Sequence, residues 1–68
     1  MTQCQRIKQW LDDFGSITPL EAMHELGIMR LAARISDLEK DGVEIHHEMV
    51  KDKNRYGESV HYMRYKAV

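Results

Sequence analysis

The sequence has little of what secreted domains, membrane proteins and enzymes depend on. Its 68 residues include one cysteine and one proline. A single cysteine rules out an internal disulfide, and no apolar run approaches the roughly 20 residues that a membrane span requires. Residues 1–5 lack the basic start and apolar core of a signal peptide. These absences predict a cytoplasmic protein that has no contact with membranes.

The chain is also short for an active site. A domain of this size buries only about 60% of its unfolded surface, which leaves little room for a deep substrate pocket. No glycine-rich phosphate loop, nucleophile elbow or pair of catalytic carboxylates is recognisable. The hydrophobic share of 43% is nevertheless that of an ordinary folded domain. We therefore expect one domain over residues 1–68 that is not an enzyme and uses no cofactor.

Apolar residues recur at helical spacing in the first part of the chain, from Thr2 to Phe14. Thr2 and Gln5 have the spacing of a capping box, and Gly15 supplies a stop. The apolar stripe, which we expect in the core, comprises Cys4, Ile7, Trp10, Leu11 and Phe14. The single apolar residue Ile17 then stands between turn residues, as in a short strand.

Two more helices are predicted before the pattern changes. Thr18-Pro19-Leu20-Glu21 has the N-cap, first-turn proline and third-position acid of a helix start, and Gly27 ends this second helix. Its expected apolar stripe is Leu20, Met23 and Leu26. The core positions of the third helix are Leu31, Ile35 and Leu38. It ends at Asp41-Gly42, with Lys40 in the last turn.

After Gly42 apolar and polar residues alternate, which predicts strands. Two alternating runs, 43–50 and 59–65, flank the polar segment 51–57 and indicate an antiparallel hairpin. One register places apolar pairs on one face and an opposite-charge pair on the other. Its expected pairs are Val50 with Glu58, Val43 with Tyr65, Ile45 with Met63, and Glu44 with Arg64.

This order of elements is that of a winged helix-turn-helix, an α+β fold with three helices and a C-terminal two-stranded β-hairpin wing. Over residues 2–66 the chain resembles the small winged-helix proteins of phages and prophages. The resemblance is carried by Gly15–Met23, by Gly27–Leu38 and by Asp41-Gly42 before an alternating strand. It implies sequence-specific binding of double-stranded DNA in transcriptional or recombination control, with the third helix in the major groove. The turn after Ile28 is shorter than in bacterial winged-helix repressors, so we expect Met29 and Arg30 to begin the third helix directly.

The outward face of the third helix supplies the first set of candidate DNA contacts. These are Met29, Arg30, Ala33, Arg34, Ser36, Asp37 and Lys40. Arg30 suits a guanine edge, and Ala33 or Met29 suits a thymine methyl group. Arg34 and Ser36 suit phosphates. The alternative interpretation is a solvated helix face without function.

The hairpin supplies the second set, which is Lys51, Lys53, Arg55 and Tyr56 on the predicted loop. Between Lys51 and Lys66 five basic residues stand against two acidic ones, a local charge of +3 in a chain whose net charge is -1. Long cations there reach phosphates or the minor groove. The alternative is a polar tip that keeps the hairpin soluble.

The sequence leaves three other kinds of site or assembly open. His46, His47 and His61 invite a metal site, with His47 opposite His61, but the ligand spacing of a zinc site is absent, so no metal is expected. A protein-binding adaptor or inhibitor of a host or phage protein would use an apolar patch of Met29, Val50, Val60 and Tyr62. A homodimer on a palindrome would enlarge the contact with DNA.

Overall fold

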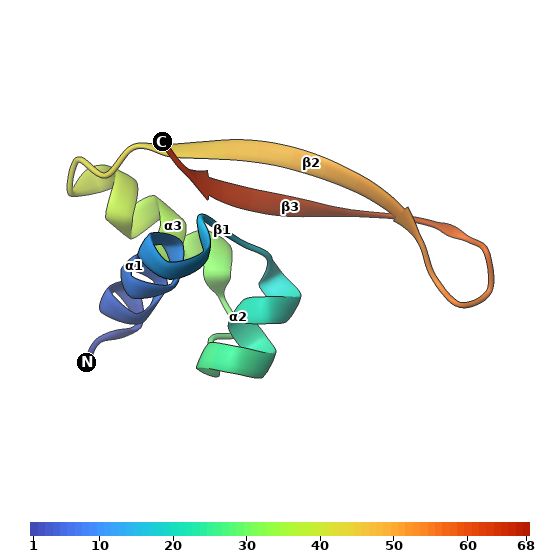
Figure 1. Cartoon of the computed structure of the whole chain (residues 1–68), viewed down its shortest axis with the longest axis horizontal. Coiled ribbons are helices and arrows are strands. Elements are labelled where there is room, and N and C mark those ends of the chain that lie inside the picture. Colours follow the sequence, from blue (N-terminus) through green and yellow to red (C-terminus); the bar gives the residue numbers. More distant parts are fainter.

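The computed structural model covers all 68 residues, and Figure 1 shows helices packed at one end and a long hairpin that projects from them. The elements follow the predicted order. They are α1 (Gln3–Phe14), β1 (Ser16–Ile17), α2 (Pro19–Leu26), α3 (Leu31–Lys40), β2 (Ile45–Lys53) and β3 (Ser59–Ala67). The predicted winged helix-turn-helix architecture is therefore confirmed, although the sheet has three antiparallel strands in the order β1-β3-β2 rather than two.

Both predicted capping boxes are present. The Thr2 hydroxyl accepts a hydrogen bond from the Gln5 backbone, and the Thr18 hydroxyl accepts one from the Glu21 backbone. Helix α1 ends at Gly15 with φ 83°, and α2 ends at Gly27 with φ 68°. Both glycines are in the left-handed conformation, which residues with a Cβ atom disfavour.

The start of α3 differs from the prediction. Met29 lies outside the helix, and Arg30 is its N-cap residue with φ -115° and ψ 63°, so the helix begins at Leu31. No side chain caps this end of α3. The short turn after Ile28 is thus taken up by non-helical backbone, with a bend at Met29, rather than by two further helical residues.

The hairpin register is also wrong in the prediction, by four residues along the partner strand. Val50 pairs with Tyr62, Ile45 with Ala67, His47 with Tyr65, and Glu48 with Arg64. The cause is a tight turn that Asn54 closes: its side-chain Oδ1 accepts hydrogen bonds from the backbone N–H groups of Tyr56 and Glu58. Residues 51–53 consequently extend β2 instead of forming a loop. Because the slip is even, every side chain stays on its predicted face.

The core lies where α1, α2, α3 and the stem of the sheet meet. Its buried members are Ile7, Leu11, Ile17, Ala22, Ile28, Leu31, Ile35, Leu38 and Tyr65. Three predicted core residues are exposed, with exposed fractions of 66% for Phe14, 62% for Leu20 and 40% for Met23. Leu26, also predicted in the core, is only partly buried against it. In the short helix α2 the buried residue is the small Ala22, so Leu20 and Met23 point outward.

Cys4 and Trp10 are only partly buried at the edge of this core. The Trp10 indole donates a hydrogen bond to the Ser16 carbonyl at 2.9 Å, which ties α1 to β1. Phe14 lies against the Trp10 ring, with centroids 4.3 Å apart. None of the three helices has the length and apolar character that crossing a membrane requires.

Candidate nucleic-acid interface

The outward face of α3 is small and largely apolar near its start. Leu31, Ile35 and Leu38 are buried, so the opposite side of the helix meets solvent. Of the predicted contacts on this side, Ser36 and Lys40 are exposed and Ala33 is half-buried. Arg30 and Met29 are exposed just before the helix, with Met29 76% accessible.

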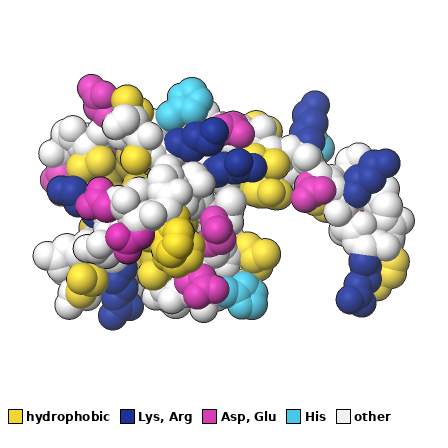
Figure 2. Space-filling model, viewed as in Figure 1, with side chains coloured by type: hydrophobic (Ala, Val, Ile, Leu, Met, Phe, Trp, Pro, Cys, Tyr) yellow, Lys and Arg dark blue, Asp and Glu magenta, His cyan; other side chains and the backbone are white.

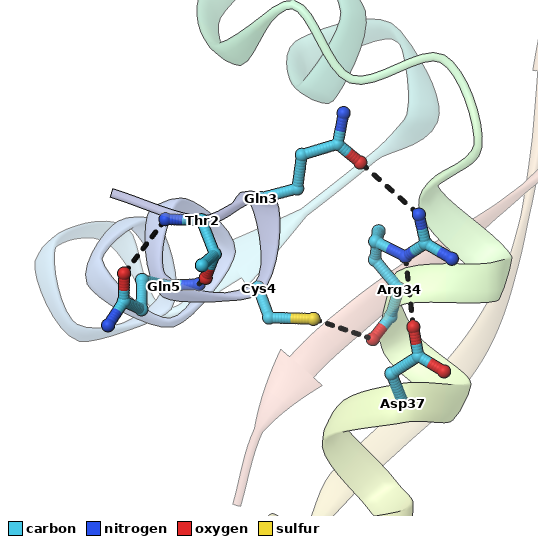
Figure 3. Close-up of polar contacts among 6 residues, drawn as sticks. All are labelled: Thr2, Gln3, Cys4, Gln5, Arg34 and Asp37. Atoms are coloured by element: carbon cyan, nitrogen blue, oxygen red, sulfur yellow. Dashed lines mark hydrogen bonds and ion pairs between the residues drawn. The ribbon is translucent and has the colours of Figure 1, made fainter.

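Arg34 and Asp37 belong to a contact between helices. Figure 3 shows the Arg34 guanidinium between two partners: Nε donates to the Asp37 carboxylate at 3.0 Å, and Nη1 donates to Oε1 of Gln3 at 3.3 Å. Cys4 Sγ lies 3.9 Å from the Arg34 carbonyl. These bonds direct Arg34 toward α1, so two of the predicted contact residues are held by the fold.

The two faces of the hairpin differ in charge. Odd-numbered residues of β2 and β3 share the face of buried Tyr65, because successive side chains alternate along a strand. On this face, here called the basic face of the wing, lie Lys51 and Lys53, with His47 and His61, and no carboxylate. The strand carboxylates are confined to the other face.

That other face is close to neutral. Lys66 Nζ lies 2.8 Å from the Glu48 carboxylate, and Arg64 is paired across the strands with Glu48. The hydrogen bond from Lys66 holds the pKa of Glu48 below its usual value, helped by the charges of Lys66 and Arg64. The predicted charge of +3 is therefore not uniform. Its uncompensated part lies on the basic face, because the charges of Arg55 and Glu58 at the tip cancel.

The tip carries the remaining candidates. Arg55 and Tyr56 lie in the turn between β2 and β3, and Tyr56 is 77% exposed. Lys51 and Lys53, predicted in this loop, lie on β2 instead. Figure 2 shows Lys and Arg side chains distributed over the projecting end of the hairpin. A cationic, protruding end is suited to reaching phosphates on either side of a groove.

His47 joins the wing to α3. Its Nε2 lies 3.1 Å from the Glu39 carboxylate, and its ring meets Tyr65 edge-on with centroids 5.1 Å apart. The predicted pairing of His47 with His61 is wrong: His47 lies opposite Tyr65, and His61 lies opposite Lys51. No group of three or more histidine, cysteine or acidic side chains is placed to hold a metal ion.

An apolar groove lies between α2 and the wing. It is lined by Thr18, Pro19, Leu20, Met23, Met29, Asp52 and Tyr62. Of the apolar patch predicted for a protein partner, Met29 and Tyr62 line this groove. Val60 is 36% exposed and Val50 is half-buried, both on the wing itself.

Sequence reasoning missed three residues that shape this surface. Gln3 contacts Arg34 across 31 residues of the chain, and Glu39 contacts His47 across eight. Each pair joins two different elements, so no local sequence pattern marks it. Asn54 had a readable signal, since an asparagine three positions before Gly57 is typical of a turn.

A family model described as a winged helix-turn-helix domain matches residues 2–66 of the chain. No curated protein and no solved structure matches it.

Proposed function

The chain belongs to the winged helix-turn-helix family, and on that premise we propose that it binds double-stranded DNA sequence-specifically. In this proposal α3 enters the major groove and the wing lies on the backbone or in the minor groove. The direct contacts are Met29, Arg30, Ala33, Ser36, Lys40, Lys51, Lys53, Arg55 and Tyr56. Arg34 and Asp37 contribute by fixing the orientation of α3.

The observation that carries the proposal is the distribution of charge on the wing. Lys51 and Lys53 share a face to which the two strands contribute no carboxylate, whereas Glu48 and Asp52 share the other. A hairpin that only needed solubility has no reason to separate charges by face. A polyanion bound on one side requires this arrangement, because each acid near a phosphate opposes binding.

The resemblance to small phage and prophage proteins supports a regulatory role in the cytoplasm, in transcription or recombination. The net charge of -1 is compatible with this role. It keeps the general attraction to DNA weak, so that the contacts of α3 and the wing decide where the protein binds.

A salt titration on a random duplex tests the proposal. Binding is expected at low salt, with an affinity that falls linearly on a log–log plot. Lys53→Ala is expected to weaken binding to all duplexes and to reduce the slope by about one unit. Arg64→Ala is the matched control, because Arg64 lies on the opposite face of the wing, and its slope stays that of the unaltered protein. Equal slopes for all three proteins would contradict the proposed wing contact.

Arg30 tests the helix in the same assay. Arg30→Ala is expected to reduce discrimination between sequences selected from a random library by about 1–3 kcal/mol. Its effect on the random duplex is expected to be smaller. A uniform loss on all sequences would make Arg30 a phosphate contact instead.

The groove beside α2 favours a second candidate function, that of a protein-binding adaptor or inhibitor of a host or phage protein. Leu20, Met23 and Met29 expose apolar side chains there, which is unusual for a surface without a partner. Absence of duplex binding even at low salt would favour this function. Leu20→Glu is then expected to abolish capture of the partner, whereas Lys53→Ala leaves it intact.

A homodimer on a palindromic site is a further part of the proposal, because one small domain covers little DNA. Sedimentation of the protein with a selected site distinguishes one bound copy from two.

A further inference from the structure

Most side chains of α3 that are able to read base edges by hydrogen bonds are already engaged. Arg34 donates to Asp37 and Gln3, which occupies the guanidinium and the Asp37 carboxylate together. The Glu39 carboxylate lies 3.1 Å from His47 on the wing. Arg, Lys, Asp and Glu are the residues that form specific pairs with guanine and cytosine. Within α3 only Lys40 and the hydroxyl of Ser36 remain free, and Arg30 stands just before the first turn.

Apart from Arg30, which precedes the helix, the surface left open at the start of α3 is apolar. Ala32 is exposed, Ala33 is half-buried, and both line a shallow groove with Met29. Pro19 and the Tyr65 ring form the walls of this groove toward α2 and the sheet. Because alanine side chains are short, a group that enters this groove comes close to the backbone of α3.

A base edge placed against the side chains of Met29, Ala32 and Ala33 loses water without gaining a hydrogen bond from them. That loss is unfavourable for the polar atoms of guanine, cytosine and adenine. Thymine presents the one apolar group of the major groove, its 5-methyl. The same surface gains free energy from burying that methyl group.

We propose that the Met29–Ala32–Ala33 surface reads the 5-methyl group of pyrimidines, so that the preferred DNA is rich in thymine where α3 contacts it. This inference rests on the proposed DNA binding and adds its substrate class. The proposal also predicts that 5-methylcytosine in the contacted position binds as thymine does, because both bases carry a methyl group on ring atom C5.

The test compares duplexes that differ only in methyl groups. The unaltered protein is titrated with an alternating A·T duplex and with the same duplex in which deoxyuridine replaces thymidine. The thymine duplex is expected to bind about fourfold more tightly for each methyl group buried. Equal binding to the two overturns the methyl inference and leaves the proposed function standing. No binding to either at low salt overturns the proposed function itself.

A second pair separates the methyl group from the shape of A·T-rich DNA. A G·C duplex carrying 5-methylcytosine is compared with its unmethylated form. A gain of the same size as in the first pair supports the inference. No gain here means that the first difference arose from duplex shape, and the inference fails.

A variant assigns the effect to α3. Ala32→Ser/Ala33→Ser adds hydroxyl groups where the methyl contact is proposed. The ratio between the thymine and deoxyuridine duplexes is expected to fall toward one, while Glu39→Gln, a control on the same helix outside the proposed contacts, retains the ratio. A retained ratio in the double variant overturns the assignment. If circular dichroism shows that the double variant is unfolded, the two duplex comparisons with the unaltered protein decide.

Discussion

Arg34 has two partners on different helices, Asp37 within α3 and Gln3 on α1. Its side chain is about one-third exposed, so solvent weakens the ion pair. The bond to Gln3 matters for the site because it joins the proposed recognition helix to the helix behind it. We therefore expect the side chain to orient α3 rather than to contact a phosphate.

We expect Arg34→Ala to lower the free energy of unfolding by about 1 kcal/mol, the usual value of a partly exposed charged hydrogen bond. The slope of the salt titration on random duplex is expected to stay unchanged. Urea unfolding and the salt titration measure the two effects. Gln3→Ala, which removes only the contact with α1, is the companion variant with a smaller loss. A slope reduced by one unit in Arg34→Ala would show a phosphate contact.

Glu48 makes stability depend on pH. Its pKa in the folded protein is lowered by the hydrogen bond from Lys66, so the carboxylate stabilises the fold above the unfolded pKa, near 4.5. This contribution is lost as pH falls through the lower folded pKa. Melting temperatures of the protein and of Glu48→Gln are therefore expected to differ most at neutral pH and to converge below about pH 4.

Glu44 is the control for this titration, because it lies just before β2 and forms no ion pair. Glu44→Gln is expected to follow the unaltered protein across the range. A gap between the protein and Glu48→Gln that persists in acid would refute a role for the Glu48 charge.

Among the helices, α2 is the one whose stability depends most on the residues at its ends. It has eight residues, fewer than an isolated helix needs in water. It is held by the Thr18 capping box, by Pro19 in the first turn and by the packing of Ala22. This helix leads directly into the turn before α3, the proposed recognition helix.

Thr18→Ala removes the capping hydroxyl and is expected to cost about 1 kcal/mol of stability, within a range of roughly 0.5–2 kcal/mol. Thr18→Ser keeps the hydroxyl and is expected to stay close to the unaltered protein. Urea unfolding of the three proteins measures the difference. An equal loss in both variants would place the effect in the threonine methyl group rather than in the cap.

The elements also show which parts of the fold local patterns predict. Helix bounds followed from Thr2, Thr18, Gly15 and Gly27, because caps act through neighbours within three or four residues. The hairpin register did not follow, because alternation has period two and is satisfied by every even slip. The turn that Asn54 closes determines which of these registers forms.

As a whole molecule, the protein is elongated, 39 Å by 22 Å by 21 Å, since the hairpin extends beyond the helices (Figure 1). Only 9 of 68 residues are buried, so each core side chain carries a large share of the stability. A core this small supplies only about 3–5 kcal/mol in total.

Ile28 shows this dependence. It is 1% exposed and lies between α2 and α3. Ile28→Ala is expected to lower the free energy of unfolding by about 2–4 kcal/mol, which leaves much of the chain unfolded at 25 °C. Ile28→Val removes one methylene and is expected to cost about 1 kcal/mol. Near-native stability of Ile28→Ala would show that the turn between the helices is not anchored in the core.

The sequence by itself determined the order of the elements, the ends of α1 and α2, and the face on which each strand residue lies. These features depend on neighbours within a turn or on a period of two. Only the tertiary structure decided that Arg34 turns to Gln3, that His47 meets Glu39 and that Leu20 stays exposed. Such contacts join residues from different elements, and their geometry exists only when the helices pack around a common core.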